Sequence, residues 1–332
     1  MASTTPVKQP FPAQSHQAII RAVSEAACAT WFVRSQNYNE DSWSKSDKTP
    51  VTVADLASQA IILSAVAEIA PQEKVLAEEE IGSLNDDNRA SRVREVVEEI
   101  RRKSFSVKEI RECVGYRGDP EAKNWWLVDP LDGTKGFILG LVYSIAVARI
   151  VNGSLDRSWM AAPGKEDSLP GVIGHLFHAV RGQGAYRSHL NNPTEETRLP
   201  HLPESYIPPL LVAGSRAHGG AELPKPILDA GISAVNIPLD SQAKYAAIAV
   251  GAAHLYPRKH STTFGYNFAW DHGPGTLLVQ ECGGVVTDLH GDPLDFSTGK
   301  RLSANVGILA ASSPKVHNQF LDLLRYPKET VR

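Results

Sequence analysis

Two acidic residues, Asp129 and Asp132, follow directly on an apolar run that ends at Val128. A strand over residues 125–128 would deliver both carboxylates to a tight turn, where Gly133 lets the backbone reverse sharply. Carboxylates and a free carbonyl at a strand end are hard oxygen ligands that suit Mg²⁺. Main-chain N–H groups exposed at such a turn suit a phosphate. The segment indicates a metal-assisted phosphoryl site, although the motif alone also fits an ordinary surface turn.

Further acidic residues stand at the ends of apolar segments elsewhere in the chain. Asp55 lies three residues after Thr52 at an expected helix start, a spacing typical of a capping box. Asp271 precedes another expected helix. Three glutamates at 78–80 follow a short apolar strand, and because they cannot all point inward, the second and third are expected to be solvated. Taken singly, each of these acids is also explained as a helix cap or a solvated side chain.

The chain resembles the inositol-monophosphatase-like superfamily of Mg²⁺-dependent, lithium-sensitive phosphatases in four segments that occur in the same order. These segments are TPVTVAD at 49–55, the Glu-Glu pair at 78–79, WLVDPLDGTKGF at 126–137 and WDHGPGTLLVQECGG at 270–284. Within the superfamily, LDSQAKY at 239–245 together with DGTKGF is similar to the 3'(2'),5'-bisphosphate nucleotidases. Those enzymes remove the 3'-phosphate of adenosine 3',5'-bisphosphate. The likeness extends from about Ala13 to the last expected helix.

The resemblance implies a role for each matching residue. Asp55 and the hydroxyl of Thr134 are expected to activate the attacking water. Two or three Mg²⁺ ions are expected, with five ligands: Glu78, Asp129, the main-chain carbonyl of Leu131, Asp132 and Asp271. The substrate is expected to contact Gly133 and Thr134 at the scissile phosphate, Ser241, Lys244 and Arg258 at a second phosphate, and His218 near the nucleoside.

The resemblance implies hydrolysis of adenosine 3',5'-bisphosphate to AMP and phosphate, with 3'-phosphoadenylyl sulfate as a second candidate substrate. One alternative is a phosphatase of the same superfamily that acts on inositol phosphates or another small phosphorylated metabolite. Another is a non-catalytic, nucleotide- and metal-binding regulatory protein, which the intact acidic set speaks against. The chain departs from its relatives chiefly at residues 138–142, where an apolar Ile-Leu-Gly-Leu-Val replaces a polar stretch. Ala77 and Gly273-Pro274 depart as well, without removing an expected metal ligand.

The same resemblance implies an α/β (α+β) fold, a layered αβαβα sandwich of the inositol monophosphatase/fructose-1,6-bisphosphatase type. An N-terminal α+β part over residues 13–205 would carry most metal ligands. A C-terminal α/β part over residues 206–332 would carry Asp271 and the nucleotide-side residues.

Apolar periodicity predicts helices and strands in an order compatible with that fold. The first helix runs from Ala13 to about Gln36, and the second from Thr52 to Pro71. A strand is predicted at 75–77, and the densely charged residues 82–124 are predicted to form solvated helices in a lid or insertion. Further strands are predicted at 125–128, 143–151, 155–162, 172–180 and 184–186, with a hairpin at Asn152-Gly153. Five prolines mark residues 189–209 as the linker, after which strands and helices alternate.

Composition narrows the classes of function. Among 332 residues, 34 Lys and Arg against 37 Asp and Glu give a formal net charge of −3, which argues against binding nucleic acid through a global basic field. The three cysteines show neither a disulfide framework nor zinc-site spacing, so a reducing compartment is expected. The longest apolar run, 137–148, is too short to span a bilayer. A cytoplasmic enzyme with a small phosphorylated substrate, and with neither nucleic acid nor membrane as partner, is therefore expected.

Overall fold

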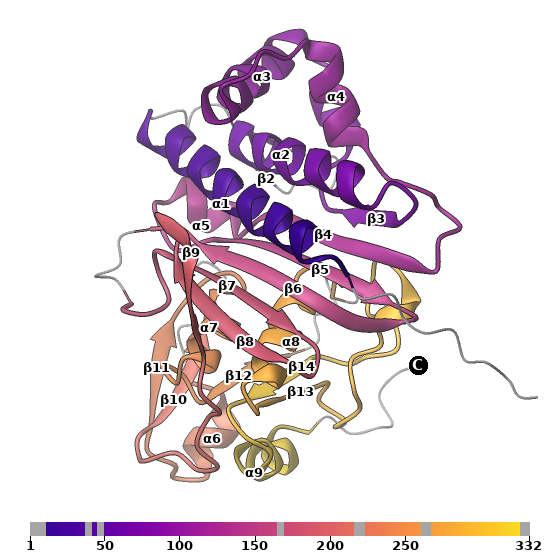
Figure 1. Ribbon diagram of the computed structural model, residues 1–332. Helices are drawn as coiled ribbons and strands as arrows, with labels where there is room; N and C mark the ends of the chain where they lie inside the picture. The colour runs from indigo at the N-terminus through magenta and orange to yellow at the C-terminus, as the bar shows by residue number, and fades with distance from the viewer. Residues whose placement is uncertain are drawn as a thin grey trace, which may run out of the picture.

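Helices and sheets lie in alternating layers in the computed structural model, which describes residues 11–36, 42–44, 50–164, 169–215, 223–259 and 267–325. Figure 1 shows α1 and α2 on one side of a first sheet, α7 and α8 between that sheet and a second one, and α6 and α9 beyond it. This order confirms the predicted layered αβαβα fold. The helices are α1 (Ala13–Ser35), α2 (Val53–Ile69), α3 (Asp87–Arg101), α4 (Val107–Gly115), α5 (Thr134–Ile138), α6 (Lys225–Asp229), α7 (Ala243–Ala249), α8 (Gly273–Glu281) and α9 (Pro314–Leu324).

The first sheet has seven strands in the order β3-β4-β5-β6-β7-β8-β9, and only β3 and β4 run parallel. β4 continues past Val128 to Asp132, with a shift in register between Asp129 and Asp132. That irregularity accommodates Pro130, which has no N–H to donate to the neighbouring strand. The strands are β3 (Lys74–Ala77), β4 (Asn124–Asp132), β5 (Ser144–Val151), β6 (Ser154–Ala162), β7 (His175–Val180), β8 (Gly184–His189) and β9 (Asn192–Arg198).

The linker prediction over residues 189–209 is wrong in its first half, where β9 pairs with β8 as the edge strand. Pro193 is tolerated there because an edge strand needs no second set of hydrogen bonds. β9 is polar and almost wholly exposed, so it carries no apolar alternation to predict it. A short hairpin of β1 (Ser42–Ser44) and β2 (Pro50–Thr52) before α2 was also not predicted. The division of the chain at residue 205 stays a prediction.

The second sheet has five strands in the order β11-β10-β12-β14-β13. Its core with α6 and α9 includes Leu210, Ile227 and Phe320. α8 lies between the sheets and packs against β6 and β7 on one side and β13 and β14 on the other. The strands are β10 (Leu210–Gly214), β11 (Ala234–Pro238), β12 (Leu255–Arg258), β13 (Val285–Thr287) and β14 (Ile308–Ala311).

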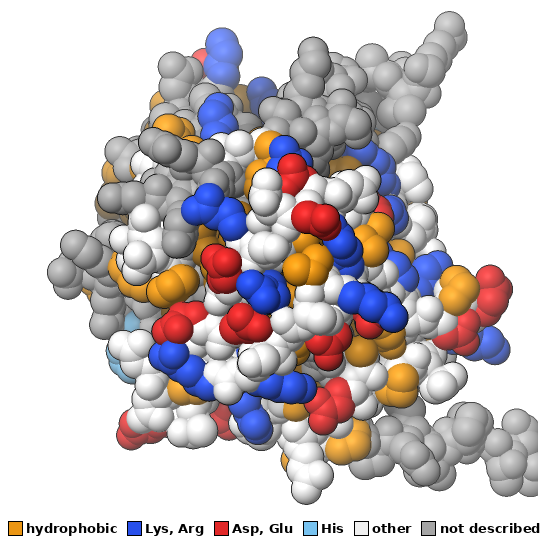
Figure 2. All heavy atoms as spheres, turned by 90° about the horizontal axis from the view of Figure 1, so that it is seen from above, with side chains coloured by type: hydrophobic (Ala, Val, Ile, Leu, Met, Phe, Trp, Pro, Cys, Tyr) orange, Lys and Arg blue, Asp and Glu red, His pale blue; other side chains and the backbone are white. Residues whose placement is uncertain are grey.

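The charged residues 82–124 form α3 and α4, which pack against α2 as the outermost helices of Figure 1. Val93, Val97 and Ile110 are buried in the core that these helices share with α2. Seen from that side, the surface intersperses basic and acidic side chains, without a patch of one sign (Figure 2). The prediction of charged, solvated helices is confirmed, with the addition that one face is buried. Of the described helices, none combines the length and the apolar character that crossing a bilayer requires.

Candidate active site

The N-terminus of α2 fixes the orientation of Asp55. Thr52 is the N-cap and forms the predicted capping box with Asp55, which is fully buried. Asp55 Oδ2 accepts hydrogen bonds from the Thr52 N–H over 2.8 Å and from its hydroxyl over 2.5 Å. Asp55 Oδ1 is then left to face Thr134, whose hydroxyl lies 3.0 Å away. The structure thus brings together the two residues expected to activate water.

The turn after β4 holds Thr134 and the carbonyl of Leu131 side by side. Gly133 has a φ of 92° and begins α5, and the Thr134 hydroxyl lies 3.2 Å from the Leu131 carbonyl oxygen. Ser58 on α2 donates a hydrogen bond to the Pro130 carbonyl over 2.6 Å. α2 therefore holds both Asp55 and the backbone of this turn, so the two move as one unit.

Four acidic residues from three segments lie beside this turn. Glu78 follows β3, Asp129 and Asp132 close β4, and Asp271 precedes α8. Burial raises the pKa of Asp129 well above its usual range, and the charges of Glu78, Asp132 and Asp271 raise it further. The Asp129 carboxyl also hydrogen-bonds Glu78. These four side chains are called the acidic cluster below.

Asp132 and Asp271 connect the acidic cluster to two cations. Burial raises the pKa of Asp132 to about 6, while Lys244 and Arg258 oppose the shift. Burial and the charge of Asp132 raise the pKa of Asp271 to about 8, again against Arg258 and Lys244. Acids and cations therefore act on one another within a single site.

The acidic cluster fits a hard divalent cation. Asp129 Oδ1 is buried and has no hydrogen-bond partner among the described residues. Burying an unpaired carboxylate oxygen is costly, and Mg²⁺ is a partner that an all-oxygen donor set favours. Within the described part of the chain, no three His, Cys, Asp or Glu side chains are already gathered closely enough to hold an ion.

The segment between β11 and α7 approaches the turn after β4 closely. A Cβ atom on Gly133 would lie only 3.3 Å from the Cβ of Ser241. Gly133 is therefore required by its left-handed backbone and by its neighbour. Ser241, with a φ of 63°, is itself left-handed, an uncommon conformation for a residue with a side chain. The expected phosphate-binding turn and the expected second-phosphate residue Ser241 are thus in contact.

Lys244 and Arg258 supply positive charge beside these turns. Lys244 is 6% exposed, and its Nζ lies 5.2 Å from the centre of the Tyr256 ring. Partial desolvation lowers the pKa of Arg258, but Tyr256, Asp271 and Asp132 together raise it above its ordinary value. His218, the remaining substrate candidate, lies in 216–222, outside the described residues.

Three residues without a predicted role also belong to the site. Gln242 donates its main-chain N–H to Asp132 Oδ2 over 2.5 Å. Tyr245 Oη lies 2.7 Å from His272 Nδ1. Burial, with the charges of Arg258 and Lys244, lowers the pKa of His272 well below its usual range, so its imidazole is neutral. The one sequence signal for all three is their place within the matched motifs.

The expectation that Glu79 is solvated is wrong, since Glu79 is fully buried whereas Glu80 is exposed. Gln59 on α2 donates to the Glu79 carbonyl and accepts from its N–H, over 2.7 and 3.0 Å. Arg117 donates to the same carbonyl over 2.6 Å. These contacts fold the chain inward directly after Glu78. Glu80 pairs with Lys300 at the surface over 3.0 Å, as a solvated acid would.

Residues 140–142 of the apolar stretch line a cavity of about 320 Å³ together with Asp240 and Arg34. Arg34 donates to the carbonyls of Phe137 and Leu141, over 2.8 and 2.9 Å. The chain's main departure from its relatives therefore borders the segment that carries Ser241 and Lys244.

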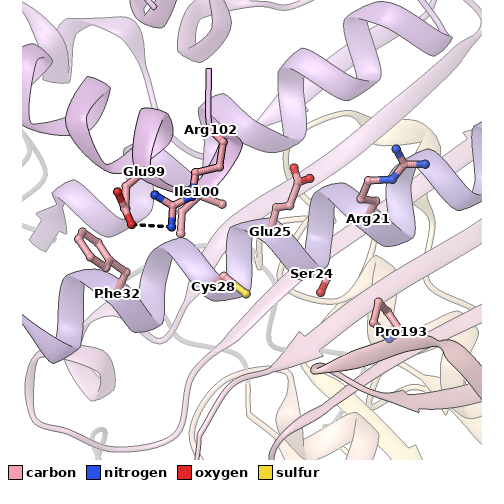
Figure 3. A pocket seen from close by; sticks show the side chains of 9 residues that line it. All are labelled: Arg21, Ser24, Glu25, Cys28, Phe32, Glu99, Ile100, Arg102 and Pro193. Atoms are coloured by element: carbon pink, nitrogen blue, oxygen red, sulfur yellow. Dashed lines mark ion pairs between the residues drawn. The ribbon is translucent and has the colours of Figure 1, made fainter. Parts of the chain in front are cut away.

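A second cavity of about 330 Å³ lies between α1 and α3 and contains none of the candidate site residues. Figure 3 shows Cys28 and Glu25 of α1 facing it, with the Glu99–Arg102 ion pair on the opposite wall. Burial and the charge of Glu25 raise the pKa of the Cys28 thiol, which keeps it protonated.

The layered fold brings an acidic strand end to face a helix N-terminus, an arrangement that suits a metal-assisted phosphoryl site. A profile of the inositol monophosphatase family matches residues 9–325. The chain therefore belongs to the inositol monophosphatase family, in which dependence on Mg²⁺ is typical.

Individual relatives agree with that membership. The chain is 34% identical to the 3'(2'),5'-bisphosphate nucleotidase of Schizosaccharomyces pombe, over 89% of this chain and 90% of the relative. It is 33% identical to the probable 3'(2'),5'-bisphosphate nucleotidase 4 of Arabidopsis thaliana, over 88% and 89%. The fold matches the extragenic suppressor protein suhB of Bartonella henselae with a TM-score of 0.64 at 18% identity, covering 96% of this chain and 100% of that one. An inositol monophosphatase-II structure with 2'AMP bound matches with a TM-score of 0.60 at 17% identity, covering 94% of this chain and 93% of that one.

Proposed function

We propose that this phosphatase is a Mg²⁺-dependent 3'(2'),5'-bisphosphate nucleotidase that converts adenosine 3',5'-bisphosphate to AMP and phosphate. The observation that carries the proposal is the electrostatic contact of Asp132 and Asp271 with Lys244 and Arg258. A site built for one phosphate needs a metal and a phosphate cradle, whereas further positive charge beside them suits a second phosphate. The names of the relatives point the same way. By the same chemistry, 3'-phosphoadenylyl sulfate is a second candidate substrate.

We assign the metal ligands to the acidic cluster and the neighbouring main chain. Two or three Mg²⁺ ions would be held by Glu78, Asp129, the Leu131 carbonyl, Asp132 and Asp271. Bound Mg²⁺ supplies Lewis-acid stabilisation and lowers the pKa of water. The chain itself supplies a base: the Thr134 hydroxyl donates to Asp55, so Thr134 Oγ1 can take a proton from the attacking water as its own proton passes to Asp55 Oδ1.

We assign the substrate groups to the two touching turns. Gly133 and Thr134 would offer main-chain N–H groups to the 3'-phosphate. Ser241, Lys244 and Arg258 would hold the 5'-phosphate, and His218 would lie near the nucleoside. One phosphate would thus react while the other would only bind. Substrates with a single phosphate lack the binding group and should react poorly.

Phosphate release from a panel of substrates tests the proposal. The panel contains adenosine 3',5'-bisphosphate, 5'-AMP, inositol 1-phosphate and a sugar phosphate, each with Mg²⁺ and with a chelator. We expect rapid, Mg²⁺-dependent release from the bisphosphate and much slower release from 5'-AMP. Preference for inositol 1-phosphate would instead identify an inositol phosphatase. Binding of the bisphosphate without release, with Mg²⁺ bound, would identify a regulatory protein.

A further inference from the structure

Gln242 joins the two sides of the site through three hydrogen bonds. The residue is 1% exposed. Its main-chain N–H donates to Asp132 Oδ2 over 2.5 Å, and its side-chain Nε2 donates to the Trp270 carbonyl over 3.0 Å. Its Oε1 accepts from the Gly275 N–H over 3.3 Å. The partners therefore lie at the end of β4 and on both flanks of Asp271.

The two side-chain bonds pin the segment that carries Asp271. The first N–H groups of a helix have no partner within the helix, and the N-cap side chain usually supplies one. The N-cap of α8 is His272, whose side chain caps none of them. Gln242 provides an acceptor from outside the helix, at Gly275, and also holds the carbonyl directly before Asp271. Residues 270 and 275 are thus fixed by one side chain.

The main-chain hydrogen bond of Gln242 orients the other carboxylate, that of Asp132. Ser241 adopts a left-handed conformation that directs the following N–H of Gln242 toward Asp132. Asp132 belongs to β4 of the first sheet, whereas Asp271 precedes α8, which lies between the sheets. Gln242 contacts both segments, so its length and orientation govern how far apart the two carboxylates stand.

We propose that Gln242 is a positioning residue that sets the separation of Asp132 and Asp271 and thereby the affinity of the site for Mg²⁺. This inference rests on the proposed function, because it takes both carboxylates as Mg²⁺ ligands. Residues that orient metal ligands from outside typically alter metal affinity by about 10- to 100-fold when they are removed. Gln242 acts at two ligands at once, through the main chain on one and the side chain on the other.

Calorimetric titration of the full-length protein with Mg²⁺, without substrate, tests the role of Gln242. Gln242→Met keeps the length of the side chain and removes both of its hydrogen bonds, while the main-chain bond to Asp132 remains. We expect the Mg²⁺ dissociation constant to rise about 10-fold or more. Gln242→Asn keeps the amide but is too short to reach both partners, so it should raise the dissociation constant as well. This second variant still tests the inference if Gln242→Met fails to fold.

Asn305→Leu is the matched control, because Asn305 is another buried amide with hydrogen bonds to the Pro293 carbonyl and the Asp295 N–H. Its loss should lower the melting temperature and leave the Mg²⁺ dissociation constant unchanged. Mg²⁺ affinities of both Gln242 variants within two-fold of the wild type would overturn the inference while leaving the proposed function intact. A wild-type protein that binds no Mg²⁺ would overturn the proposed function, and the inference with it.

Discussion

At the scale of single residues, the site assigns separate tasks to the oxygens of one carboxylate. Asp55 Oδ2 is occupied by Thr52, so Oδ1 alone faces the hydroxyl of Thr134. The two oxygens of Asp132 also differ in their partners. Oδ2 accepts the Gln242 N–H, which leaves Oδ1 for another partner. Hydrogen bonds from the backbone thus decide which oxygen remains for chemistry.

Asp132→Asn should abolish turnover and leave the fold intact. The variant removes a charge proposed to hold Mg²⁺, while its side-chain oxygen still accepts the Gln242 N–H. We expect phosphate release to fall at least about 10²-fold, with a melting temperature no lower than that of the wild type, because a buried charge is removed. Activity within a few-fold of the wild type would show that the metal site is wrongly assigned.

Lys244→Met should impair use of the bisphosphate more than that of a monophosphate. A hydrogen bond to a charged group contributes about 1.5–3 kcal/mol, so kcat/KM for adenosine 3',5'-bisphosphate should fall about 10- to 100-fold. The value for 3'-AMP, which lacks the second phosphate, should change little. Lys315→Met, at an exposed position on α9, serves as control. An equal loss on both substrates would contradict a second-phosphate role for Lys244.

At the scale of elements, the N-terminus of α2 contributes both to the stability of the fold and to the geometry of the proposed catalytic base. Thr52 caps the helix and also orients Asp55. A matching capping box of Ser106 and Glu109 begins α4, where its residues are exposed and touch no candidate site residue. The two helices therefore begin with the same capping structure, but only the one at α2 includes a residue with a proposed catalytic role.

Thr52→Val should lower both stability and activity. Loss of an N-cap costs about 1 kcal/mol, and the freed Asp55 should lower kcat about 10-fold, a part of what a positioned base contributes. Thr52→Ser should restore both properties. Ser106→Ala should lower the melting temperature alone. If Thr52→Val and Ser106→Ala affect only stability, and to the same extent, Thr52 has no part in orienting the base.

Sequence patterns predicted the elements whose boundaries are marked by a cap, a glycine or an apolar face. α1 and α2 begin where the sequence indicates, and the Asn152-Gly153 hairpin shows the positive φ angles of a tight turn. β9 was missed because an exposed edge strand has no apolar period. Burial of Glu79 was missed because its cause is Gln59, 20 residues earlier in the chain. The direct contact of Gly133 with Ser241 likewise depends on tertiary packing.

At the scale of the whole molecule, the acidic cluster makes stability depend on pH. A carboxyl whose pKa is raised on folding stabilises the fold while it is protonated, and this contribution is lost as pH rises through the raised pKa. The pKa rises from the usual 3.8 to about 6 for Asp132 and about 8 for Asp271. The contribution of Asp132 and Asp271 to the stability of the metal-free protein should therefore fall progressively between about pH 4 and pH 8, because burial and the neighbouring carboxylates oppose their ionisation. Buried histidines such as His272, whose pKa is lowered, act in the opposite direction, so this contribution is read as the difference between the wild type and Asp132→Asn.

Mg²⁺ should reverse that loss. In differential scanning fluorimetry of the metal-free proteins, the melting temperature of the wild type relative to that of Asp132→Asn should fall from pH 5.5 to pH 8. Added Mg²⁺ should raise the wild-type melting temperature more at pH 8 than at pH 5.5, and Asp132→Asn should weaken this effect. A difference between wild type and variant that rises over this pH range would contradict the raised pKa values.

The position of α8 between the two sheets also bears on how the protein is made. Its residues arrive late in synthesis, yet they cover β6 and β7, which end at Ala162 and Val180, whereas α8 begins only at Gly273. Until α8 emerges from the ribosome, that face of the first sheet is an uncovered apolar surface and Asp271 is missing from the site. A prematurely terminated chain that ends before α8 should consequently be inactive and prone to aggregation, so quality control of the nascent chain should concentrate on this stage.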